Sequence, residues 1–454
     1  METLAPPSVG SEIRVASAPP GSPVEARWNL AFVGILAYLI VEYTRLPAMF
    51  PVLQVLHLGK VVVLLSVFGL LLAPRTGTAS TKETRRIYFA LIVVLFAGLL
   101  SALFTRYEEK TWGGFRDAAL YLTIAFLISR IVNTSWRMRV FFWLFLLLNL
   151  KLGQFVIRSY FFLRNLGETE VTLAKGVGAG STGFFSNSAD LGVAMCIAWG
   201  LTMPLLFANW KKFQRLVVMG CSLTFLVAIL LCGSRGALVG AGAIVAVALF
   251  HAPRKSIPIV MATLFIAGVV FFLPKANWDR LQSAANWRND GNARARIGFW
   301  MAGLQMLRDH PFLGVGIGNF STAYARDYVN PEITTREMAS HSLYIQALSE
   351  LGMLGTLPIL LSVLLFVRQN SRTRRRVLTT LPAGRRSFEY CLAVGLDLAL
   401  VGYLVSGAFL SVLFYPFLWI LLGVSIGLSS CCPPQPVEGG SLAEAPSAVA
   451  ALGA

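Results

Sequence analysis

Long apolar runs recur along almost the whole chain, and short connections between them carry most of the charge. Twelve such segments of 16 to 26 residues can be delimited. A helix of about 20 apolar residues crosses the hydrocarbon core of a bilayer. The runs lack the strict apolar/polar alternation of a membrane barrel. They therefore predict an all-α, polytopic membrane protein with about twelve transmembrane helices, at 29–46, 52–73, 87–105, 115–132, 138–156, 188–208, 216–232, 236–251, 256–274, 342–367, 389–409 and 412–428.

Composition supports a membrane protein over a soluble one. Charged residues make up only 13% of the chain, against about 25% in a soluble domain. The net charge of +17 is a pattern that nucleic-acid-binding proteins also show. In a membrane protein it follows more simply from basic cytoplasmic connections, so we expect no nucleic-acid partner. The six cysteines have no spacing typical of a metal site or a disulfide framework, and we expect no metal and no cofactor.

The charge of the connections predicts the orientation. Every second connection is short and basic, and the positive-inside rule places these on the cytoplasmic side. Both termini then lie in the cytoplasm, and no signal peptide is expected because no apolar core precedes Trp28. The predicted organisation is a disordered tail (1–28), nine membrane helices (29–274), a periplasmic catalytic loop (275–341), three more membrane helices (342–428) and a second disordered tail (429–454).

The opposite connections are also rich in arginine and lysine, which the positive-inside rule does not predict. An anionic ligand on the outer face would explain these cations, and neutralisation of lipid headgroups is the alternative. They lie in 157–187, in the turn 233–236 and in the loop 275–341.

The loop 275–341 is predicted to have structure of its own. Apolar residues recur with a helical period in 293–309, and His310-Pro311 should end that helix. The glycine-rich stretch 311–320 predicts a tight turn with close backbone packing. Ser340 is a candidate cap for the next helix. We expect that helix, 342–367, to be overlong at about 39 Å and to lift His341 clear of the bilayer.

His341 is the candidate catalytic residue. It combines an outer location, a helix mouth and nearby arginines, which would keep it neutral as a general base must be; a purely structural histidine is the alternative. Arg235, Arg296 and Arg294 are candidate phosphate-binding residues, because guanidinium is permanently charged and bidentate; their alternative is a surface cation. The segments 216–232 and 236–251 are short for spanning helices, which would sink Arg235 to the membrane surface.

Other polar residues near the site are weaker candidates. Trp300 shares a helix face with Arg296. Asn187 opens the helix after 157–187, where ordinary capping is the alternative. Together with Tyr344 these are possible donor or acceptor contacts. Glu350 lies nine residues after His341, on the opposite helix face, and is expected to be a packing or interhelical polar group.

Three motifs resemble one family. His341-Ser342, nine residues, Gly352, two residues and Gly355 resemble the signature of bacterial O-antigen ligases. GSRGAL (233–238) is similar to their arginine motif. Residues 294–320 resemble the wider O-antigen ligase/polymerase superfamily, which also contains protein O-oligosaccharyltransferases. Val239 and Ser342 depart from the usual leucine and asparagine, so ligase, polymerase and protein glycosylase stay open.

The resemblance implies a glycosyltransferase of GT-C-like architecture in the bacterial inner membrane. It would move a glycan from an undecaprenyl-diphosphate carrier to an acceptor hydroxyl at the periplasmic face, without a metal. The acceptor would be lipid A core, a growing glycan or a protein. By position, His341 would assist the acceptor and Arg235 and Arg296 would hold the diphosphate. A transporter is the alternative from another class, although the chain shows no half-to-half repeat.

Overall fold

The computed structural model describes residues 27–44, 50, 53, 55–73, 81–165, 188–251, 256–273, 278, 291–331, 333–334 and 336–432. Both predicted disordered tails lie largely outside these ranges. Within them the secondary structure is helical, apart from one isolated bridge between Asn330 and Thr334. The all-α prediction is therefore confirmed.

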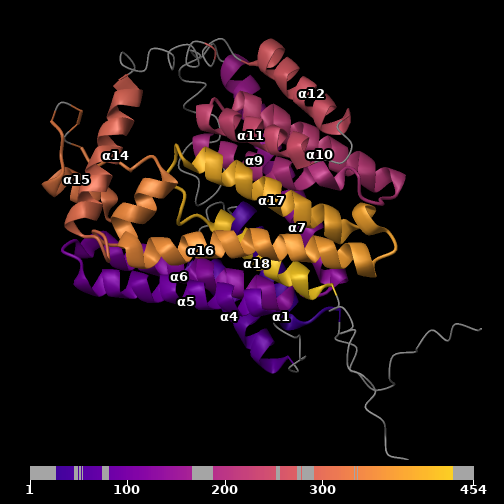
Figure 1. The fold of residues 1–454 in the computed structure, drawn as a ribbon, viewed down its shortest axis with the longest axis horizontal. Helices are drawn as coiled ribbons and strands as arrows, with labels where there is room; N and C mark the ends of the chain where they lie inside the picture. Colours follow the sequence, from indigo (N-terminus) through magenta and orange to yellow (C-terminus); the bar gives the residue numbers. More distant parts are fainter. Residues whose placement is uncertain are drawn as a thin grey trace, which may run out of the picture.

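Each of the twelve apolar segments overlaps one helix (Figure 1). These helices are α1 (Leu30–Thr44), α4 (Leu58–Leu72), α5 (Lys82–Phe104), α6 (Glu108–Ile131), α7 (Ser135–Asn165), α9 (Ser188–Leu205), α10 (Lys212–Leu231), α11 (Arg235–His251), α12 (Ser256–Phe272), α16 (Leu343–Thr380), α17 (Phe388–Gly407) and α18 (Pro416–Ser430).

Six of the described helices are long and apolar enough to cross a membrane by length and composition: α5, α7, α9, α10, α16 and α17. Five further apolar helices, in α1, α4, α11, α12 and α18, are shorter. The chain is thus a helical, polytopic membrane protein, while twelve complete crossings remain a proposal.

Two predicted helix lengths were wrong. Helix α10 begins at Lys212 and spans 20 residues, so it is not short, and only α11, with 17 residues, remains so. Helix α16 is not a straight rod of 26 residues. It extends over 38 residues to Thr380 and breaks at Gly352, where φ is 57° and ψ is −160°. Its extra length therefore lies at the basic end, away from His341.

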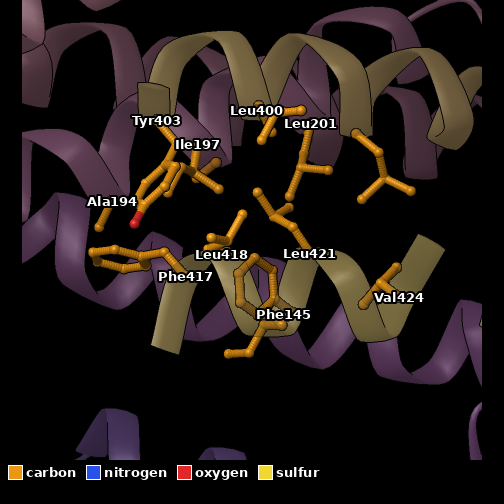
Figure 2. Close-up of a cluster of buried hydrophobic side chains, with 14 of the residues drawn as sticks. Phe145, Ala194, Ile197, Leu201, Leu400, Tyr403, Phe417, Leu418, Leu421 and Val424 are labelled. Carbon is orange, nitrogen blue, oxygen red and sulfur yellow. The ribbon is translucent and has the colours of Figure 1, made fainter. Parts of the chain in front are cut away.

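The centre of the bundle is formed by α9 and α17, which cross closely. A Cβ at Gly200 of α9 would lie 2.8 Å from the backbone nitrogen of Ala399, and a Cβ at Gly395 of α17 would lie 2.7 Å from the carbonyl oxygen of Leu201. Small residues at such crossings let helix backbones approach in membranes. Side chains of α7, α9, α17 and α18 fill the space beside the crossing, among them Phe145, Ile197, Leu400 and Leu421 (Figure 2).

The polar loop folds at one end of the bundle, to the left in Figure 1, beside the first turns of α16. It contains α14 (Gly291–Asp309) and α15 (Phe320–Asp327), so the predicted loop helix and its end at His310-Pro311 are confirmed. A small apolar core of its own joins α14 and α15; its buried members are Tyr107, Phe299, Ala302, Met306, Val315, Phe320, Ala323 and Tyr324.

Candidate active site

His341 stands immediately before α16 in a backbone conformation that residues other than glycine rarely adopt. Its φ is +50°, in the left-handed region that is costly for residues other than glycine. Ser342, rather than Ser340, caps the helix, because its hydroxyl accepts the N–H of Ile345 at 3.5 Å. Ser340 instead donates to the carbonyl of Ser342 at 3.1 Å and lies 2.8 Å from the hydroxyl of Ser411. The predicted Ser340 cap was therefore wrong, and Ser340 ties the mouth of α16 to the connection between α17 and α18.

The imidazole of His341 is half-buried against an aromatic pair. Its ring lies 6.0 Å from that of Phe299, which meets Tyr324 edge-on at 5.1 Å. Burial lowers the pKa of His341 below its usual 6.5, and the nearby Arg296 lowers it further. No hydrogen bond joins the imidazole to another described residue, and the ring of Phe299 is its aromatic neighbour. The lowered pKa favours the neutral form of the histidine at pH 7, which is the form that accepts a proton.

Helix α14 carries both candidate arginines of the loop, Arg294 and Arg296, but they do not act as a pair. Arg296 is partly buried and close enough to His341 to affect its pKa, whereas Arg294 is exposed. Two residues along a helix turn a side chain by about 200°, so the two guanidinium groups point in different directions. Trp300 follows one turn after Arg296 and is partly buried, and its enclosed indole nitrogen has no hydrogen-bond partner among the described residues.

The break in α16 is where the loop joins the membrane helix. The interruption at Gly352 frees backbone groups, and the segment after α14 binds them. Met353 and Leu354 donate to the carbonyls of Pro311 at 2.9 Å and Phe312 at 3.1 Å, and Val315 donates to Ser349 at 2.8 Å. A Cβ at Gly352 would lie 2.4 Å from the carbonyl oxygen of Phe312. The second half of the sequence motif thus has a structural cause, since only glycine fits this junction.

The glycine-rich turn is tight, as predicted, and a residue that the sequence analysis did not single out holds it. Gly314, Gly316 and Gly318 all have positive φ. The fully buried amide of Asn319 donates to the carbonyl of Tyr107 at 3.0 Å and to the hydroxyls of Thr105 and Thr111. This contact fastens the turn to the connection between α5 and α6. In the sequence, the position of Asn319 directly after the three alternating glycines was the one sign of this role.

The same connection holds a more distant part of the loop. Lys110 forms an ion pair with Glu337 and donates to Ser321 at 3.3 Å, and Tyr107 donates to Asp327. The predicted loop therefore rests on Tyr107 of that connection and on Lys110 in the first turn of α6, to which the charge pattern did not point.

Glu350 is buried and does not touch His341, which confirms its expected role as an interhelical polar group. Its carboxylate accepts the backbone N–H groups of Gly318 at 3.1 Å and Phe320 at 3.2 Å, and the amide of Gln346 at 3.4 Å. It thereby serves as the N-terminal cap of α15, since the side chain of Asn319 makes no cap bond.

Arg235 is the first residue of α11, and its helix start is capped by Ser234, whose hydroxyl accepts the N–H of Ala237 at 3.2 Å. A Cβ at the next residue, Gly236, would lie 3.4 Å from the carbonyl oxygen of Ser406 in α17. A Cβ at Gly407 would lie 3.1 Å from the side chain of Leu343, two residues after His341. Arg235 and His341 therefore flank the same end of α17.

The two other predicted contact residues are Asn187 and Tyr344. Asn187 lies outside the described residues. The helix that it precedes, α9, begins at Ser188, and its Asp190 accepts a hydrogen bond from Tyr415 at 3.0 Å. Tyr344 is half-exposed and its hydroxyl donates to the carbonyl of Leu404 at 3.0 Å, so it helps to hold α16 to α17.

Among the described residues, no group of three or more His, Cys, Asp or Glu side chains is placed to hold a metal ion.

Residues 220–360 match the family model described as O-antigen ligase. Over this range the chain is similar to that family. The range contains the GSRG turn, α14, the glycine-rich turn, His341 and the Gly352 junction, and the resemblance drawn from the motifs is confirmed here. Asn187 precedes it. No curated protein sequence matches the chain.

Proposed function

We propose that this protein is an inverting glycosyltransferase that moves a glycan from an undecaprenyl-diphosphate carrier to an acceptor hydroxyl. The observation that carries the proposal is His341. It is half-buried, it has a lowered pKa, and it lies beside Arg296 at the mouth of a membrane helix. A neutral histidine next to a permanent cation is suited to take a proton where a diphosphate is bound.

The proposed reaction is a single displacement. The acceptor O–H gives its proton to the imidazole of His341, and the acceptor oxygen forms a bond to the anomeric carbon of the donor sugar. The bond between that carbon and the diphosphate oxygen breaks, and the electron pair leaves with undecaprenyl diphosphate. Arg235 and Arg296 stabilise the charge of the leaving group in place of a metal, because guanidinium binds phosphate oxygens bidentately. Attack from the face opposite the leaving group inverts the anomeric configuration.

We place this chemistry at the periplasmic face of the bacterial inner membrane, with both termini cytoplasmic. The long basic end of α16 supports this orientation. Arg368 and Arg375 are exposed on it, Arg385 and Arg386 are exposed just after it, and such clusters are retained in the cytoplasm. The donor lipid would enter from the outer leaflet.

The acceptor class separates three related activities. Lipid A core would make the protein a ligase, a growing glycan a polymerase, and a protein hydroxyl an O-oligosaccharyltransferase. The matched family supports a ligase or polymerase type of activity in general. A polysaccharide or lipid transporter is the alternative from another class, and it predicts transport without a new glycosidic bond.

The decisive experiment replaces His341 with alanine in a strain that lacks the chromosomal copy. We expect attached glycan to disappear while the lipid-linked donor accumulates. His310→Ala is the matched control, because His310 lies in the same loop outside the site, and it should restore glycan attachment. Normal attachment by His341→Ala protein present at the wild-type level would overturn the assignment of the base.

The diphosphate assignment is tested by donor binding. We expect Arg235→Ala and Arg296→Ala to weaken binding of the lipid-linked donor about tenfold or more, since charge-assisted hydrogen bonds to phosphate contribute roughly 1.5–3 kcal/mol each. Arg308→Ala, which removes an exposed cation from the end of α14, should have little effect. Equal weakening by all three variants would indicate general charge attraction instead of a defined site.

A further inference from the structure

A buried polar pair on α16 connects three elements around His341. Glu350 holds the start of α15 through two backbone N–H groups. Gln346, one turn earlier, donates its amide to Glu350 and accepts the backbone N–H of Leu413 at 3.1 Å with its carbonyl oxygen. Leu413 belongs to the connection between α17 and α18. Both side chains are at least nine-tenths buried, with 4% and 9% of their surface exposed.

The position of α15 determines what surrounds the histidine. Phe320, whose N–H binds Glu350, stacks on Tyr324 with 6.4 Å between ring centroids. Tyr324 meets Phe299 of α14 edge-on at 5.1 Å, and Phe299 lies 6.0 Å from the ring of His341. Phe299 is three residues after Arg296 on α14. A shift of α15 would therefore move both the aromatic wall and the guanidinium beside the imidazole.

The other arm of the pair reaches the opposite side of His341. Leu413 is two residues from Ser411, whose hydroxyl lies 2.8 Å from that of Ser340. Ser340 immediately precedes the histidine and also binds the carbonyl of Ser342. One hydrogen-bonded pair thus holds α15 and the α17–α18 connection, and that connection in turn contacts Ser340 beside the candidate base.

We propose that Glu350 and Gln346 are positioning residues for transfer: they hold α15 and the α17–α18 connection so that Phe299 and Arg296 stay against His341. The inference rests on the proposed function of His341. Glu350 touches neither the histidine nor, in our assignment, the substrate.

A carboxylate is required at position 350 for a chemical reason. Three donors converge on it, and a carboxylate offers only acceptors. A glutamine there would direct an N–H₂ group toward a donor and leave one of them without a partner, which costs about 1–3 kcal/mol in a buried site. Glu350→Gln should therefore displace α15 while preserving side-chain volume.

The test measures glycan transfer in spheroplasts of the deletion strain, carrying each variant, at external pH values from 5 to 9. The cells supply their own donor and acceptor, and the outer face is open to the buffer. We expect Glu350→Gln to lower the rate at pH 7 roughly 10- to 100-fold, as misplacement of a catalytic group does. The acid limb of its profile should also move upward toward the ordinary pKa of histidine, because His341 becomes more exposed and Arg296 moves away. Gln346→Met should also lower the rate and raise the apparent pKa of the acid limb, each to a smaller extent than Glu350→Gln.

Ser349→Ala is the matched control. Ser349 is buried in the same turn of α16, but its hydroxyl bonds within the helix, to Ile345 at 2.6 Å, and it should keep the wild-type acid limb. A rate for Glu350→Gln that falls equally at every pH, with the limb unchanged, would show a purely structural role and overturn the inference. If Glu350→Gln protein fails to accumulate, Gln346→Met decides by the same criterion. A fully active His341→Ala variant would overturn the proposed function itself. If His341→Ala is inactive but Glu350→Gln and Gln346→Met both keep the wild-type pH profile, only the positioning role would be overturned.

Discussion

Arg296 lies close enough to His341 to lower the pKa of its imidazole, although 44 residues separate them in the chain. Arg296 is on α14, a helix of the polar loop, and His341 precedes the membrane helix α16. The two meet because the segment between them folds back through the glycine-rich turn and α15. This relationship brings a permanent cation and a neutral base to one place, which is the arrangement that the proposed transfer requires.

The first prediction concerns pH. Burial and Arg296 lower the pKa of His341 below 6.5, so the neutral, proton-accepting form increases as pH rises through that lowered value. The transfer rate should rise along an acid limb whose apparent pKa is below 6.5 and should be level by pH 7. Arg296→Gln should move the limb upward, though not fully to 6.5, because burial is the larger cause. Arg294→Gln removes the same charge from an exposed position, and an equal shift in that variant would contradict the specific pairing.

A second prediction concerns the junction at Gly352. Alanine there would adopt a backbone conformation that is essentially restricted to glycine, and its Cβ would lie 2.4 Å from the carbonyl oxygen of Phe312. We expect Gly352→Ala to destabilise the protein by about 2 kcal/mol or more, measured as a lower thermal midpoint in detergent. Gly220→Ala is the control, because nothing lies within 4 Å of the added Cβ in α10. Equal midpoints for the two variants would refute the account of the junction.

Asn319 provides a third prediction. Replacement by leucine removes the donor for the carbonyl of Tyr107 and for two threonine hydroxyls in a buried site, at a cost of about 1–3 kcal/mol. The loop should separate more readily from the α5–α6 connection, so protease added to spheroplasts should cleave residues 291–341 faster than in the wild type. Ser321→Ala removes only the exposed contact with Lys110 and should leave cleavage unchanged. A resistant Asn319→Leu loop would show that the contact is dispensable.

The fourth prediction tests the orientation. In a variant without Cys431 and Cys432, a cysteine at Arg326 in the loop should react with a membrane-impermeant maleimide in intact spheroplasts. A cysteine at Arg375, which is exposed near the far end of α16, should react only after permeabilisation. The reverse pattern would place the candidate site in the cytoplasm and exclude the proposed transfer at the periplasmic face.

Hydropathy, charge and glycine placement in the sequence were enough to determine the helical membrane architecture, the loop helix on α14 and the tight turn after it. Each depends on local properties: the length of an apolar run, a helical period, and φ angles open to glycine. The same information identified His341 and Arg296 as candidates and placed Glu350 away from the histidine. The break of α16 was not predicted, because the apolar run continues through Gly352 and a helical pattern does not show where backbone bonds pass to another segment.

Only the tertiary structure decided which polar residues share a location. It separated Arg294 from Arg296, assigned the helix cap to Ser342 instead of Ser340, and joined Asn319 to the α5–α6 connection. It also connected Glu350 and Gln346 to α15 and to Leu413. The contacts of Asn319, Glu350 and Gln346 with other elements join segments from 30 to more than 200 residues apart, and no periodicity encodes them. They form because buried donors and acceptors must find partners once the helices are packed, and that requirement is set by the folded arrangement as a whole.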